Sequence, residues 1–137
     1  MRKHSKRAVL ALAGTVTIAG SVAVSSPAMA ASTPIGACGG GSYHVVDKHD
    51  LGPSVIYLMY NGSTNCVVNW KDSPSSAFID VWIWRQSDGE GPYDGGNFST
   101  YAGPVKLYAA GDCIIWGGST KTSSDWKSWE SHWEHCG

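Results

Sequence analysis

The apolar and polar residues of this chain alternate in short runs separated by Gly, Pro, Asn and Asp, which is typical of strands joined by turns. The clearest alternation covers residues 77–86. Ile79, Val81 and Ile83 fall on one face of this run, whereas charged, polar and tryptophan residues fall on the other. A repeat of two residues predicts a β-strand with two different faces.

Five further runs carry strand signals. Residues 55–60 are apolar on both faces, which predicts a central strand. Asn61-Gly62 follows and favours positive φ angles, so we expect residues 66–70 to return as the hairpin partner. The other predicted strands cover residues 43–47, 105–109 and 113–116. Six short strands predict an all-β fold, either a small antiparallel β-sandwich or a partly open barrel.

The tail predicts a short C-terminal helix, because its three tryptophans and its cysteine recur every three or four residues. These residues are Trp126, Trp129, Trp133 and Cys136. Ser124 or Asp125 can cap such a helix. We expect the tryptophan side of the helix to pack on the sheet.

The first thirty residues have the composition of a secretory signal peptide. A basic head precedes a largely apolar run over residues 8–24, and small residues at 28–30 provide a cleavage site. The expected organisation is a signal peptide over residues 1–30, a flexible leader over 31–41 and a single β domain over 42–137. We therefore expect a secreted protein in an oxidising environment.

Charge and motifs exclude several functions. After residue 30 the chain has six Lys and Arg residues against eleven Asp and Glu residues, a formal charge near −5. Nucleic-acid binding needs clustered cations that this part lacks, and no apolar run in it approaches the roughly 20 residues that span a bilayer. No hydrolase, zinc-protease or phosphate-loop motif occurs. We expect no enzymatic activity, no cofactor, no nucleic-acid partner and no transmembrane segment.

Four cysteines in a short exported chain predict two disulfides. Three pairings are possible. Cys38 and Cys136 lie near the two ends, whereas Cys66 and Cys113 lie beside apolar runs. We therefore expect a terminal Cys38–Cys136 bond and a core Cys66–Cys113 bond.

Five short segments resemble a known family when they are taken together, in this order and with the four cysteines. They are Gly36-Ala37-Cys38-Gly39, Asn65-Cys66-Val67-Val68, Tyr101-Ala102-Gly103-Pro104-Val105, Gly111-Asp112-Cys113 with Trp116-Gly117-Gly118, and Trp133-Glu134-His135-Cys136-Gly137. The chain resembles the spore-associated protein A family of streptomycetes and related actinomycetes over nearly all of its exported part. The resemblance implies a small exported protein of the spore or cell envelope, with no activity or cofactor attached to the family. Residues 80–97 diverge most.

The candidate ligand-binding residues lie in this divergent stretch. Trp82 and Trp84 share one face of a predicted strand, with Arg85 and Tyr93 nearby. Such a flat aromatic face can stack on sugar rings, whereas the alternative is that both tryptophans fill the core of a small domain. Asp80 on the same face favours exposure, because carboxylates are seldom buried unpaired.

Other polar clusters have weaker interpretations. Four acidic residues could form a two-carboxylate glycosidase site or hold calcium, but the chain is short for a deep cleft and matches no calcium motif. They are Asp80, Asp88, Glu90 and Asp94. His132 and His135 with Glu134 suggest a metal at first, but converging ligands are too few once Cys136 is in a disulfide. We expect no metal.

The sequence thus predicts a secreted, non-enzymatic protein of the spore or cell-wall surface, with a structural or surface-binding role and a possible glycan partner. The alternative is a secreted inhibitor of extracellular hydrolases such as an amylase or protease, in which Trp84-Arg85-Gln86 would supply an aromatic and an arginine contact.

Overall fold

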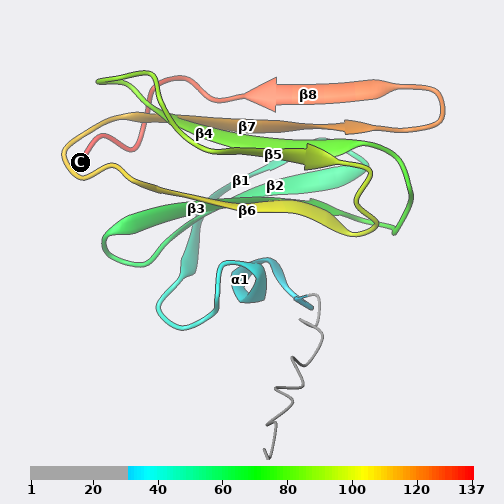
Figure 1. Ribbon diagram of the computed structural model, residues 1–137, viewed down its shortest axis with the longest axis horizontal. Coiled ribbons are helices and arrows are strands. Elements are labelled where there is room, and N and C mark those ends of the chain that lie inside the picture. The colour runs from blue at the N-terminus through cyan, green and yellow to red at the C-terminus, as the bar shows by residue number, and fades with distance from the viewer. Residues whose placement is uncertain (1–30) are drawn as a thin grey trace, which may run out of the picture.

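The computed structural model describes residues 31–137 and forms two antiparallel four-stranded sheets (Figure 1). The predicted all-β class is therefore confirmed. The predicted signal peptide over residues 1–30 lies outside the described residues. Within the described part, no helix is long and apolar enough to cross a membrane.

The first sheet has the strand order β1-β2-β3-β6. Its strands are β1 (His44–Asp50), β2 (Ser54–Tyr60), β3 (Thr64–Lys71) and β6 (Tyr101–Tyr108). β2 and β3 form the expected hairpin, in which Gly62 has a φ of 98°. The Asn61 side chain holds the turn by accepting the main-chain N–H groups of Ser63 (3.0 Å) and Thr64 (2.8 Å).

The second sheet has the strand order β5-β4-β7-β8. Its strands are β4 (Ile79–Arg85), β5 (Tyr93–Gly96), β7 (Ile114–Lys121) and β8 (Trp126–Glu130). The alternation along β4 has the predicted effect, because Ile79, Val81 and Ile83 are fully buried. β5 was not among the predicted strands and lies between those predicted over residues 77–86 and 105–109.

One apolar core lies between the two sheets, since its residues come from the facing sides of both. It comprises Ile56, Leu58, Val67, Ile79, Val81, Ile83, Ala102, Val105, Leu107, Ala109, Ile114 and Trp116. A polar contact also joins the sheets, because the buried Asn69 amide on β3 donates to the main-chain carbonyls of Asp80 (3.0 Å) and Ser119 (3.1 Å). These contacts fix how the second sheet sits on the first.

The segment that the sequence predicted as a flexible leader packs on part of the outer side of the first sheet. It contains the short helix α1 (Pro34–Ala37), which lies below that sheet in Figure 1. Cys38 follows α1 and is fully buried against Met59, Cys66 and Val68. The first sheet thus packs against the second sheet on one side and is partly covered by this segment on the other.

The predicted C-terminal helix is wrong. The tryptophan segment instead forms the edge strand β8, paired antiparallel with β7 from Gly117↔Glu130 to Lys121↔Trp126. The same residues also fit a repeat of two, because Trp129 turns toward Trp116 while Trp126 and Glu130 face the other way. Pairing with the open edge of β7 satisfies main-chain groups that an isolated short helix would leave exposed.

The predicted disulfide pairing is also wrong. The bonds are Cys38–Cys66 and Cys113–Cys136, rather than Cys38–Cys136 and Cys66–Cys113. Cys66 points to the outer side of the first sheet, where the N-terminal segment lies, so it cannot reach the start of β7. Each bond therefore fastens one terminal segment to its own sheet.

Candidate ligand-binding face

The outer side of the second sheet carries an exposed group of aromatic residues, here called the aromatic face. Its members are Trp82, Trp84, Tyr93, Trp126 and Trp133. Antiparallel partners place their side chains on the same side of a sheet. Trp82 is paired with Tyr93 on β5 and with Gly117 on β7, which in turn is paired with Glu130 on β8. The aromatic face therefore crosses all four strands.

Trp82 lies at the centre of this face and is partly buried. Its indole Nε1 donates a hydrogen bond to Glu130 Oε2 at 2.7 Å. A Cβ added at Gly117 would lie 2.8 Å from the Trp82 ring, so the absence of a side chain there gives the ring its position. Trp82 thus provides a fixed apolar surface whose polar atom is already engaged.

Trp84 lines a shallow pocket of about 350 Å³ on the same face. Gly89, Ile115, Glu130 and Trp133 complete the lining. Trp133 keeps 41% of its surface exposed. Two indoles and a carboxylate around one depression can contact both the apolar face and the hydroxyl groups of a sugar ring.

Tyr93 lies at the β5 edge of the aromatic face and is 54% exposed. Its hydroxyl donates to Asp80 Oδ2 at 3.2 Å, and Asp80 Oδ1 accepts the Ser119 main-chain N–H at 2.7 Å. Partial burial and the neighbouring Asp80 carboxylate raise the pKa of the Tyr93 phenol above its usual value of 10.0. Asp80 is buried, in contrast to the expectation of exposure, because these hydrogen bonds replace its hydration.

Arg85 does not join the aromatic face. Its guanidinium pairs with the Asp88 carboxylate at 2.8 Å and donates to the Tyr108 carbonyl at 3.1 Å. The hydrogen bond between Asp88 and Arg85 holds the pKa of the Asp88 carboxyl below its usual range. The structure therefore brings together three of the four predicted ligand-binding residues, Trp82, Trp84 and Tyr93.

The acidic residues of the predicted calcium or glycosidase cluster serve separate structural contacts. Asp88 pairs with Arg85, and Asp94 Oδ2 accepts the Gly103 main-chain N–H at 2.8 Å. Asp80 is engaged beneath Tyr93. Asp80, Asp88 and Asp94 thus each stabilise a different loop or strand.

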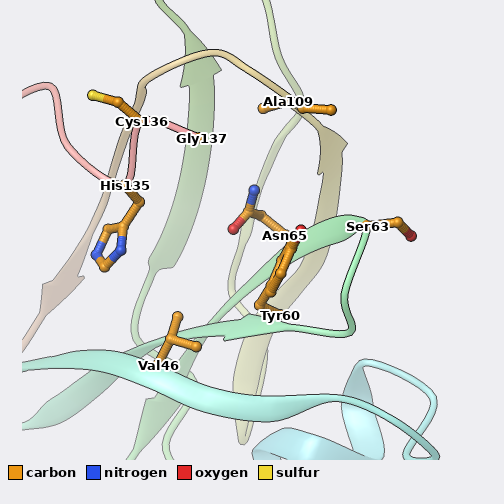
Figure 2. A pocket seen from close by; sticks show the side chains of 9 residues that line it. Val46, Tyr60, Ser63, Asn65, Ala109, His135, Cys136 and Gly137 are labelled. Atoms are coloured by element: carbon orange, nitrogen blue, oxygen red, sulfur yellow. The ribbon is translucent and has the colours of Figure 1, made fainter.

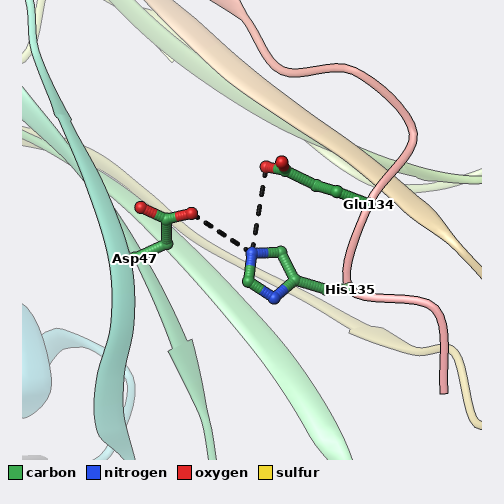
Figure 3. Close-up of side chains that lie close together, drawn as sticks. All are labelled: Asp47, Glu134 and His135. Atoms are coloured by element: carbon green, nitrogen blue, oxygen red, sulfur yellow. Dashed lines mark hydrogen bonds and ion pairs between the residues drawn. The ribbon is translucent and has the colours of Figure 1, made fainter.

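A different set of titratable side chains lies where β1 meets the C-terminal segment. Figure 3 shows Asp47 of β1 beside Glu134 and His135 of the C-terminal segment. His135 Nε2 lies 3.2 Å from Asp47 Oδ2 and 3.8 Å from Glu134 Oε1. Among residues 31–137, this is the only group of three or more His, Cys, Asp and Glu side chains placed to share an ion.

A pocket of about 320 Å³ adjoins this cluster and is shown in Figure 2. His135 and Val46 line it together with Tyr60 and Asn65 of the β2–β3 hairpin. The pocket lies at one end of the space between the two sheets.

Comparison with known proteins finds a relative of this chain. Spore-associated protein A of Streptomyces coelicolor is 30% identical over 141 aligned residues, which cover 93% of this chain and 88% of the relative. The chain belongs to the spore-associated protein A family. No family model matches the chain, and no solved structure matches it.

For this member of the spore-associated protein A family, sequence reasoning found the centre of the aromatic face but missed its rim. Trp126 and Trp133 were assigned to a helix, and a strand-period interpretation of the tail would have placed Trp126 beside β7. Sequence reasoning also missed Asp47 as a neighbour of Glu134 and His135. No local pattern could indicate this contact, because Asp47 and Glu134 are 87 positions apart in the sequence.

Proposed function

We propose that this protein is an exported, non-enzymatic component of the spore or cell-envelope surface that binds glycan through its aromatic face. The name of the Streptomyces coelicolor relative supports the spore association. Two disulfides and the basic, apolar and small-residue order of the N-terminal thirty residues support export.

One observation carries the glycan proposal, namely that aromatic rings gather on the outer side of the second sheet, where Tyr93, Trp126 and Trp133 are each more than 40% exposed. The core itself is filled without Trp82, Trp84 or Tyr93. Exposed rings in contiguous positions on a rigid sheet mark a binding surface more often than single exposed apolar residues do. A flat, half-polar surface fits a sugar ring better than a deep small-molecule pocket does.

The two-sheet arrangement supports the sandwich form of the predicted fold over the partly open barrel, because β1, β6, β5 and β8 end their sheets without joining into a closed ring. A sandwich keeps the outer side of the second sheet broad and flat, which suits contact with an extended polymer.

The first test is a pull-down of the purified, oxidised protein on washed spores, vegetative cell wall, chitin and cellulose, over a series of salt concentrations. We expect binding to at least one material that persists at high salt, because stacking on sugars is screened less than charge pairing. Absence of binding to all four materials contradicts the proposal.

A matched pair of variants locates the binding surface. Tyr93→Ala removes an exposed ring from the aromatic face, and Tyr108→Ala removes a similarly exposed ring, 61% accessible, from the other sheet. We expect Tyr93→Ala and Trp84→Ala to reduce retention while Tyr108→Ala retains the parental level. Equal retention of all three variants would show that the aromatic face is not the binding surface.

The hydrolase-inhibitor alternative is not proposed. It relied on a projecting Arg85 beside Trp84, whereas Arg85 is tied to Asp88 and to the Tyr108 carbonyl.

A further inference from the structure

We infer that Asp47, Glu134 and His135 form a binding site for a divalent transition-metal ion of the zinc type. The site is separate from the aromatic face and does not depend on the proposed glycan binding. It offers one imidazole nitrogen and two carboxylate oxygens from two segments that are distant in the sequence.

The distances suit a shared ion. Donor atoms around one zinc ion at 2.0–2.2 Å lie roughly 3.4 Å apart in a tetrahedral arrangement. His135 Nε2 is 3.2 Å from Asp47 Oδ2 and 3.8 Å from Glu134 Oε1, and the three donor atoms all lie within 4.8 Å of one another. Small side-chain rotations are enough to close this geometry, and all three side chains converge in Figure 3.

Asp47 directly follows a β-bulge in β1. Val45 is paired with Met59 and Asp47 with Leu58, so Val46 is an extra residue without a partner. Leu58 belongs to the core side of the sheet, whereas Met59 belongs to the outer side. As the partner of Leu58, Asp47 lies on the core-facing side of the first sheet, the side that His135 approaches. Bulges are often found where a strand must redirect a functional side chain.

The C-terminal segment is held in place before any ion binds. Ile114 and Glu134 exchange two main-chain hydrogen bonds of 2.9 Å each, and Cys136 is bonded to Cys113. Between these two attachments, His135 has a φ of 51°, a left-handed conformation that is uncommon for residues other than glycine. This backbone turn directs the imidazole toward β1.

Both carboxylates are oriented by neutral donors. Asp47 Oδ1 accepts the Lys48 main-chain N–H at 2.8 Å, and Glu134 Oε1 accepts the Trp116 indole N–H at 2.8 Å. Outer contacts of this kind fix the direction of metal ligands. Within residues 31–137, no Lys or Arg forms an ion pair with either carboxylate. Two carboxylates facing one imidazole leave a negative site that a cation neutralises.

The donor set selects the class of ion. An imidazole nitrogen favours zinc, copper or nickel over calcium and magnesium, which prefer oxygen ligands alone. Three protein ligands leave at least one further coordination position, and the pocket beside His135 has room for the water that would fill it. The sequence predicted no metal because converging ligands in the tail are too few once Cys136 is in a disulfide, and Asp47 was not among the candidate ligands.

The test measures Zn²⁺ binding to the purified, oxidised, chelator-treated protein by isothermal titration calorimetry, with Ca²⁺ and Mg²⁺ as comparators. We expect one Zn²⁺ per chain and much weaker Ca²⁺ and Mg²⁺ binding. Asp47→Asn, Glu134→Gln and His135→Asn should each weaken Zn²⁺ binding by at least about tenfold. Asparagine is chosen for His135 because it tolerates the left-handed backbone. His132→Asn, in the same segment but outside the cluster, should bind Zn²⁺ like the parent.

A measurement on the unaltered protein avoids any effect of the substitutions on folding. In side-chain nitrogen NMR spectra, Zn²⁺ should shift the ring signals of His135 and leave those of His44, His49 and His132 in place. Absence of saturable binding, equal Zn²⁺ and Mg²⁺ affinities, or weakening by His132→Asn as large as that by His135→Asn would overturn the assignment. Ring shifts at another histidine would also overturn it.

Discussion

Removal of the Cys113–Cys136 disulfide should destabilise the protein by about 3.4 kcal/mol, which tests the revised pairing. The bond joins residues 23 apart, and the chain-entropy relation gives this free energy for a loop of that length at 25 °C. The Cys38–Cys66 bond joins residues 28 apart, for which the same relation gives about 3.6 kcal/mol. The sequence-based Cys38–Cys136 bond would close a loop of roughly 100 residues and contribute about 4.7 kcal/mol.

The two disulfides also differ in how deeply they are buried. Cys38 and Cys66 are fully buried, whereas Cys136 is exposed. Replacement of Cys38 and Cys66 by alanine therefore loses packing as well as loop closure. We expect the double variant Cys38→Ala/Cys66→Ala to lose clearly more stability than Cys113→Ala/Cys136→Ala.

The assay is urea unfolding followed by tryptophan fluorescence, with linear extrapolation to the free energy of unfolding in water. Thiol titration of each unfolded variant supplies the control, because a variant that lacks one true pair has no free thiol. Two free thiols in Cys113→Ala/Cys136→Ala would refute the pairing. An equal or larger loss of stability in that variant would refute the argument from burial.

Three further predictions concern the second sheet and the segments that connect it to the first sheet. Gly118→Ala should cost about 1–3 kcal/mol of stability, measured by urea unfolding, because the new Cβ would lie 2.5 Å from the Asp80 main-chain oxygen; an unchanged midpoint would contradict the close approach. Ultraviolet titration should show Tyr93 ionising above pH 10, and Asp80→Asn should lower the pKa of Tyr93. Because the folded state holds the phenol proton of Tyr93 more tightly than the unfolded state does, stability should fall as the pH rises above about 10. Lys71→Met should lower thermal stability by about 2 kcal/mol, because the ammonium group donates to three main-chain carbonyls and one hydroxyl; a neutral outcome would show that water replaces these contacts.

β2, β3 and β4 were predictable from sequence because local patterns determine them. The repeat of two in β4 and the Asn61-Gly62 turn are both signals that act over fewer than ten residues. The same alternation correctly placed Trp82 and Trp84 together on one face.

The tail and the disulfides were not predictable in the same way, because tertiary contacts decide them. The tryptophan spacing in residues 126–133 indicates a helix, and pairing with the free edge of β7 overrides this local signal. The disulfide partner of Cys66 depends on which side of its sheet the N-terminal segment covers. The meeting of Asp47 with His135 depends on how β1 pairs with β2 and on the path of the C-terminal segment, and the residues around Asp47 indicate neither.

The N-terminal segment has a practical consequence for display. Cys38 and α1 occupy the side of the molecule opposite to the aromatic face (Figure 1). A molecule attached through its aromatic rings would hold this segment on the far side from the support. A peptide fused ahead of Thr33 would therefore point outward, so that an antibody could reach it while the protein stays attached.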